Sequence, residues 1–191
     1  TGLVVKDSGS YWSVFGQVIL LTLIQIGGLG IVTISLAISI VAGKKIGLMQ
    51  RSVMSDSVSS PQVGGIVKLT KFILHGVFGI EGLGAVIMAP TFIKDFGIVK
   101  GIWFAVFHSV SAFCNAGFDL MGNFSSLTRY AGNPVINITI MSLIVTGGLG
   151  FLTWADIIKN KWHFKKYRLQ TKMILTVSFF LITIPALVFY F

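Results

Sequence analysis

Few side chains in this sequence could do acid–base or metal chemistry, and they are scattered along the chain. The candidates are the single cysteine, Cys114, the three histidines His75, His108 and His163, and Glu81, which is the only acid inside a long apolar tract. A hydrolytic site needs a nucleophile and a base within hydrogen-bond reach, and a zinc site needs closely spaced Cys and His residues. Neither pattern is present, so an intramembrane enzyme built on Glu81, His75 or His108 stays open only as the weaker alternative.

A different chemistry needs no reactive side chain, because backbone carbonyls can replace the hydration shell of a cation such as K⁺. The segment Cys114-Asn115-Ala116-Gly117-Phe118-Asp119 follows a short apolar stretch, Gly101–Phe113. Glycine tolerates the backbone angles that a carbonyl strand beside a pore requires. Whether the segment can serve in this way depends on where the surrounding elements place it.

The composition is that of a helical membrane protein. Of the 191 residues, 54% are hydrophobic and only 11% are charged, and the mean hydropathy is +0.87. A soluble domain carries about a quarter charged residues. The net charge of +9 could suggest nucleic acid as a partner, but the basic residues flank apolar segments, as they do beside membrane spans. The sequence therefore predicts an all-α integral membrane protein in contact with lipid and not with nucleic acid.

Tracts with few or no charges define the expected membrane segments. They are residues 8–43, 72–93, 101–118, 130–155 and 173–191, and among them only 72–93 contains a charge, Glu81. Four of them reach the roughly 20 residues that a spanning helix needs. The exception is 101–118, whose apolar part would form a helix about 20 Å long, short of the ~30 Å hydrocarbon core.

Loop charges indicate that this short tract does not cross the membrane. Loop 44–71 carries five basic residues and one acid, and loop 159–172 carries six basic residues and no acid. Both lie on the cytoplasmic side, as the positive-inside rule favours, only if 101–118 enters and leaves on the same face. We therefore expect a re-entrant pore helix at 101–113, followed by a strand at 114–118 that returns to the outside.

The sequence also repeats itself. Gly27-Gly28-Leu29-Gly30 recurs as Gly147-Gly148-Leu149-Gly150 at an offset of 120 residues, and a glycine precedes each copy by 25 or 30 residues (Gly2 and Gly117). The chain thus looks like a fragment of a longer protein that begins inside one repeat. The expected parts are the end of repeat 1 (1–43), a cytoplasmic linker (44–71), a complete repeat 2 (72–158, with its second helix at 130–158), a basic cytoplasmic loop (159–172) and the first helix of repeat 3 (173–191).

The opening Thr-Gly-Leu-Val-Val, the paired Gly-Gly-Leu-Gly motifs and Phe113-Cys114-Asn115-Ala116-Gly117-Phe118 resemble the Trk/Ktr/HKT superfamily of potassium transporters, in particular bacterial KtrB-type pore subunits. The resemblance implies four helix–pore-loop–helix repeats around one pseudo-fourfold ion pore in the plasma membrane. It also implies a homodimer bound to a cytoplasmic nucleotide-binding ring of the KtrA type. The transported ion would be K⁺, with Na⁺ as a candidate coupling ion and no covalently bound cofactor. A structural subunit that does not conduct remains a further alternative.

Within this resemblance, the expected site is a filter formed by backbone carbonyls. Its predicted residues are Thr1, Gly2, Leu3, Cys114, Asn115, Ala116 and Gly117, and the resemblance links Gly2 with potassium rather than sodium. Glu81 is expected to accept hydrogen bonds behind a filter and to hold the carbonyl strand in place, with direct binding of the ion as the alternative role. The glycines of the two repeated motifs are expected either to allow close helix packing or to break overlong helices near the pore, and the sequence does not separate these roles.

Overall fold

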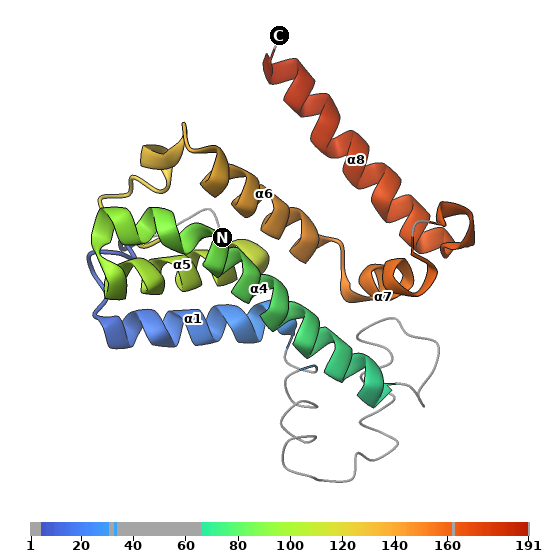
Figure 1. Cartoon of the computed structure of the whole chain (residues 1–191), viewed down its shortest axis with the longest axis horizontal. Coiled ribbons are helices and arrows are strands. Elements are labelled where there is room, and N and C mark those ends of the chain that lie inside the picture. The colour runs from blue at the N-terminus through green and yellow to red at the C-terminus, as the bar shows by residue number, and fades with distance from the viewer. Residues whose placement is uncertain (1–4, 31–32, 34–65, 162, 191) are drawn as a thin grey trace.

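The structure is a computed structural model that describes residues 5–30, 33, 66–161 and 163–190. Thr1, Gly2 and Leu3 of the expected first filter segment lie outside the described residues, as does most of linker 44–71. Regular structure in the described part is helical (Figure 1): α1 (Val14–Leu29), α4 (Ile66–Phe96), α5 (Ile98–Phe113), α6 (Pro134–Gly148), α7 (Phe151–Asn160) and α8 (Leu169–Tyr190), with short 3₁₀ turns at Thr128–Tyr130 and Phe164–Lys166.

Two of these helices are long and apolar enough to cross a bilayer. They contain the segments Leu69–Phe96 and Leu169–Phe189, and α6 with α7 would make a third span if the bent pair is counted as one. Helices α1 and α5 have 16 residues each, which gives a length of about 24 Å. Each is thus shorter than the ~30 Å apolar core of a membrane. The described residues therefore provide two to three candidate spans.

Helix α5 lies among the other helices. It packs against α4, α6 and α1, and nine of its residues are buried. By contrast, none of the most apolar 18-residue window of α8 is buried, and α8 packs mainly against α7. A short helix can end inside the apolar region of a membrane when it is surrounded by protein. The polar backbone groups at its end then contact neighbouring helices and not lipid.

The helix α5 begins at Ile98, three residues earlier than the expected start at Gly101, and it ends at Phe113 as expected. The reason for the early start is Gly97, whose φ of 82° lets the chain turn directly from α4 into α5. At the same corner, a β-carbon on Gly101 would lie 2.5 Å from the Cα of Ile93. A side chain at position 101 would therefore force the two helices apart.

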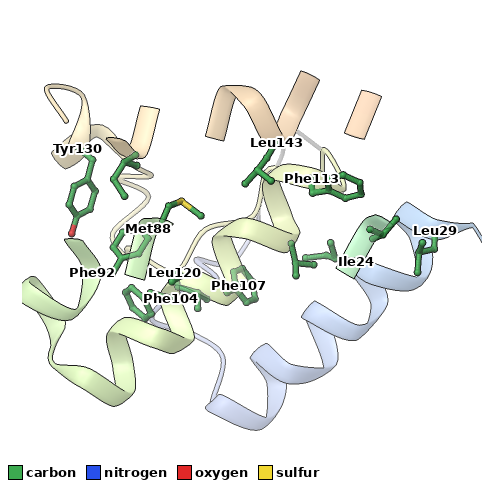
Figure 2. Packing of buried hydrophobic residues seen from close by; sticks show 14 of the residues in the cluster. Ile24, Leu29, Met88, Phe92, Phe104, Phe107, Phe113, Leu120, Tyr130 and Leu143 are labelled. Carbon is green, nitrogen blue, oxygen red and sulfur yellow. The ribbon is translucent and has the colours of Figure 1, made fainter. Parts of the chain in front are cut away.

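After α5 the chain returns to the end of the molecule at which α5 began. The hydroxyl of Tyr130, just before α6, donates a hydrogen bond of 2.6 Å to Asp95 near the end of α4. Tyr130 also packs edge-to-face on Phe92, with ring centroids 5.3 Å apart. Figure 2 shows this aromatic cluster, in which Phe92, Phe104 and Tyr130 come from three different segments. Aromatic pairs of this kind add about 0.5–1.5 kcal/mol beyond burial, so they fix the returning loop against the helices.

The expected helix 130–158 is divided into α6 and α7, which meet at an angle of 97°. The break follows Gly148, and Gly150 has a φ of 83°, a backbone conformation that suits glycine. The indole N–H of Trp154 in α7 donates to the carbonyl of Thr146 at 3.0 Å. This bond satisfies one of the carbonyl groups that the end of a helix leaves without a partner in that helix.

Candidate functional site

The segment 114–118 leaves the end of α5 in a sharp, non-helical turn. The N–H groups of Cys114, Asn115 and Ala116 bond back to carbonyls of α5 at 2.9, 3.1 and 2.9 Å. Asn115 and Gly117 have φ values of 52° and 74°, in the left-handed region that asparagine and glycine adopt most readily. Both residues are exposed. The turn therefore presents residues 115–117 at the surface of the described residues, while its N–H groups are held by the helix.

Polar side chains of α5 hold the far end of this segment. The hydroxyl of Ser111 donates to the carbonyl of Phe118 at 2.6 Å. His108 is buried, and its Nε2 lies 3.3 Å from the backbone N–H of Leu120 while its Nδ1 lies 2.7 Å from the carbonyl of Phe104. Both contacts are hydrogen bonds only if the ring is neutral with its proton on Nδ1, so we assign that tautomer. His108 therefore acts as a structural bridge, which leaves neither ring nitrogen available to a ligand.

A cavity of about 220 Å³ lies beside the segment. Gly117 and the polar side chains of Ser111, Asn115, Asp119 and Ser126 line part of it, and most of the remaining lining is apolar, including Phe118, Leu127, Ile140 and Ile144. A cavity that can hold water needs polar partners and room for at least one molecule, and this one has both. The segment thus borders a space with room and polar partners for water on one side and apolar side chains on the other.

On its other side the segment contacts Glu81 of α4. The amide nitrogen of Gln25 in α1 donates to both carboxylate oxygens of Glu81 at 3.1 Å, and the thiol of Cys114 lies 3.8 Å from Oε1. The hydroxyl of Ser109 donates to the backbone carbonyl of Glu81 at 2.6 Å. Glu81 is only 4% exposed. An acid inside a membrane span needs partners of this kind, and here they connect it to the first residue of the segment.

The two Gly-Gly-Leu-Gly motifs approach the same point from opposite helices. A β-carbon on Gly28 would lie 2.3 Å from the Sγ of Cys114, and one on Gly147 would lie 1.9 Å from the carbonyl oxygen of Phe113. At Gly27 no atom among the described residues lies within 4 Å of such a carbon. Larger residues at positions 28 and 147 would displace the end of α5, so these two glycines permit close helix packing.

Both motifs also stand at helix ends. Helix α1 ends at Leu29 and α6 at Gly148, and the final glycines, Gly30 and Gly150, have φ values of 80° and 83°. Packing and termination, the two roles that the sequence left open, are thus assigned to different glycines of one motif. A β-carbon on Gly148 would reach only the amide of Asn115, at 3.7 Å.

The loop that follows the first expected filter segment is hydrogen-bonded to the loop that follows the second. The carboxylate of Asp7 accepts hydrogen bonds from the hydroxyl of Ser10 at 2.6 Å and from the backbone N–H of Asn123 at 2.6 Å. The bond from Ser10, together with those from backbone N–H groups, lowers the pKa of Asp7. These contacts join the first and second expected repeats on the side where α5 begins.

Of the expected site residues, the structure brings Cys114, Glu81, Gly28 and Gly147 together at the end of α5. His75 and His163 do not join them, because both are exposed and each ring contacts a nearby backbone carbonyl. Sequence reasoning missed Gln25, whose only signal was a polar residue in an apolar tract one helical turn before Gly28. It also missed Ser109 and Ser111, since serine is ordinary in a membrane helix.

Comparison with known proteins assigns this chain to a family. The family model of TrkH, described as a cation transport protein, matches residues 1–191. The chain belongs to the TrkH cation transport family. It is 39% identical to the Ktr system potassium uptake protein B of Bacillus subtilis, over 98% of this chain and 41% of that protein. It is 40% identical to the potassium/sodium uptake protein NtpJ of Enterococcus hirae, over 93% of this chain and 39% of that protein.

A third relative, the Ktr system potassium uptake protein B of Vibrio alginolyticus, is 30% identical over the whole chain and 42% of its own length. The chain therefore spans about two-fifths of the length of the curated relatives it matches. The chain thus belongs to a family of cation transport proteins, and it contains helices long and apolar enough to span a membrane. Family membership excludes the intramembrane enzyme that the sequence had left as an alternative.

Proposed function

We propose that this chain forms part of the potassium-conducting pore of an uptake transporter, with residues 114–118 as one strand of its selectivity filter. The observation that carries the proposal is the short, buried helix α5, whose following segment returns to the end at which the helix began. Non-helical backbone at membrane depth is tolerated where it faces protein or a water-filled cavity. Here it lies beside a cavity that Ser111, Asn115 and Asp119 line in part, in a chain of a cation transport family.

In this proposal the ion is bound by backbone carbonyls, as in other potassium filters. The C-terminal end of α5 points at the segment, so the partial negative charge of the helix dipole favours a cation there. Glu81 supports the strand from behind through Cys114 and does not line the ion path. The same role is proposed for the carbonyls of Thr1, Gly2 and Leu3 in the first filter segment.

The architecture proposed for the complete protein is a set of helix–pore-loop–helix repeats around a pseudo-fourfold pore. Helices α4, α5, α6 and α7 would form the second repeat within residues 72–158, while α1 would end the first and α8 begin the third. The repeated glycine motifs, one on α1 and one on α6, support this assignment. The protein would cross the plasma membrane several times, with loops 44–71 and 159–172 in the cytoplasm.

The names of the relatives support potassium as the ion and a multicomponent assembly as the context. Two of them are called Ktr system potassium uptake proteins, and NtpJ is called a potassium/sodium uptake protein. On that basis we propose K⁺ as the transported ion and Na⁺ as a coupling or co-transported ion. From the resemblance to KtrB-type subunits we also propose a homodimer and a cytoplasmic nucleotide-binding ring of the KtrA type.

The test is growth of a potassium-uptake-deficient bacterium on low potassium. The full-length protein should restore growth, and a full-length variant lacking residues 101–118 should reach the membrane without restoring it. Membrane content is measured by immunoblotting of membrane fractions. Normal rescue by the deletion variant would contradict the pore assignment and would favour a structural subunit that does not conduct.

A further inference from the structure

We propose that Gln25 is a positioning residue for the filter segment 114–118, although it lies on a helix of the preceding repeat and outside that segment. It would act by orienting Glu81, which in turn contacts Cys114. This inference rests on the proposed function and assigns a part of the same site that neither motif nor charge pattern indicated.

The geometry of the Gln25–Glu81 contact is that of a specific pair. One amide nitrogen lies 3.1 Å from both carboxylate oxygens, across a sequence separation of 56 residues. A hydrogen bond between an amide and a buried carboxylate is stronger than one between neutral groups. Because glutamine brings no charge of its own, it can orient the carboxylate without placing a cation behind the filter.

Helix α1 touches the segment at a second point on the same face. Gly28 lies three residues after Gln25, so both residues face the same neighbour. A β-carbon on Gly28 would lie 2.3 Å from the Sγ of Cys114. The side chain of Gln25 and the backbone at Gly28 therefore fix the acid and the thiol from one rigid element.

Two further hydrogen bonds connect Glu81 to α5 and to Cys114. The hydroxyl of Ser109 holds its backbone carbonyl at 2.6 Å, which anchors this turn of α4 to α5. Apart from Gln25, the carboxylate has the thiol of Cys114 as a hydrogen-bond partner, at 3.8 Å. Without the amide, the carboxylate would have to find new donors, and the first residue of the filter segment would move with it.

The internal repeat shows that only the first of the two glycine motifs is accompanied by a polar residue at this position. At the offset of 120 residues, the position equivalent to Gln25 is Val145 in α6. A valine side chain cannot donate a hydrogen bond, so α6 cannot offer the same polar link to a neighbouring repeat. We therefore expect Gln25 to matter for one filter segment in particular.

The experiment compares full-length variants in potassium-uptake-deficient cells at matched membrane levels, with rubidium uptake as the assay and sodium as competitor. Gln25→Leu keeps the size of the side chain but removes its donors. We expect it to raise the apparent KM for rubidium, or the sensitivity to sodium, by about tenfold, as loss of one charge-assisted hydrogen bond would. The maximal rate per protein should fall much less, because the pore remains open.

The matched control is Gln17→Leu on the same helix. Gln17 is also buried, but it bonds to the indole of Trp103 at 2.8 Å and to the carbonyl of Trp12 at 3.2 Å, away from Cys114. Its replacement should leave the KM and the sodium sensitivity unchanged. A second variant, Gln25→Glu, places two carboxylates side by side, which disfavours charge on both, and should impair selectivity at least as much as Gln25→Leu.

The exchange Gln25→Glu with Glu81→Gln restores an amide–carboxylate pair, and it should recover most of the selectivity that either single change loses. Unchanged KM and sodium sensitivity in Gln25→Leu would overturn the proposal, as would an exchange variant that is no better than the single variants. If Gln25→Leu fails to reach the membrane, the exchange variant tests the proposal instead. Because its amide–carboxylate pair is restored, we expect it both to fold and to regain selectivity. A Gly117→Ser variant without effect in the same assay would instead contradict the filter itself.

Discussion

The close approach of α6 to the end of α5 predicts that Gly147→Ala is damaging although alanine favours helices. A β-carbon at this position would lie 1.9 Å from the carbonyl oxygen of Phe113, whereas real contacts of this kind stay above 3.0 Å. At least about 1.1 Å of movement is therefore needed between two backbones, and not merely a rotated side chain. The residue that must move immediately precedes Cys114.

The expected change in the free energy of unfolding follows from two opposing contributions. Overpacking a well-packed contact costs about 1–3 kcal/mol, and an atom fixed in the backbone places this site at the upper end. Replacing glycine by alanine within a helix returns about 0.5–1 kcal/mol. We therefore expect a net loss of roughly 2 kcal/mol in the free energy of unfolding, together with a weaker preference for potassium over sodium.

The assay is thermal unfolding of the full-length protein in detergent, followed by fluorescence-detected size-exclusion chromatography, with rubidium uptake in parallel. Gly79→Ala in α4 is the control, because none of the described atoms would lie within 4 Å of its β-carbon. The control should unfold at the wild-type temperature or slightly above it. A Gly147→Ala variant that matches the control in both unfolding and selectivity would refute the close approach.

Two further predictions concern the loop that follows the segment. His108→Leu leaves a buried backbone N–H without its acceptor, which should cost about 1–3 kcal/mol and lower the unfolding temperature, whereas His75→Leu at an exposed site should not. Tyr130→Phe removes the hydrogen bond of 2.6 Å to Asp95 and should cost about 1 kcal/mol. Burial and the bond to Asp95 raise the pKa of Tyr130 to about 12, so this contribution is present below about pH 10 and is lost as the pH rises further. A Tyr130→Phe penalty that already disappears between about pH 6 and pH 9 would contradict this reasoning.

Much of the fold could be predicted because membrane helices follow simple rules of length and charge. The half-length helix was placed from its apolar content, and its end at Phe113 agrees with the structure. Its start was placed too late, because Lys100 was treated as a loop residue. In the structure Lys100 is helical and lies over the rings of Phe96 and Phe104 at 5.5 and 5.3 Å. A cation is tolerated at the end of an apolar helix when it makes cation–π interactions with the faces of aromatic rings.

The parts that could not be predicted depend on contacts between distant residues. The glycine motif indicated either packing or a break in helix 130–158, but the angle of 97° depends on the turn at Gly150 and on where Trp154 docks. Glu81 stood out as a lone acid in an apolar tract. Its partner, Gln25, could not be identified, since a sequence separation of 56 residues gives no periodic signal.

The most direct test of the central claim is the ion selectivity of Gly117→Ser in the full-length protein. Gly117 has a φ of 74° and lines the cavity beside the segment, so a β-carbon there strains the turn that presents the carbonyls. Rubidium or potassium uptake is measured against competing sodium, with Ala89→Ser on α4 as the control at matched membrane levels. We expect Gly117→Ser to reach the membrane and to raise the apparent KM for potassium or admit sodium, while Ala89→Ser behaves as the wild type. Unchanged selectivity in Gly117→Ser would show that residues 114–118 do not line the ion path.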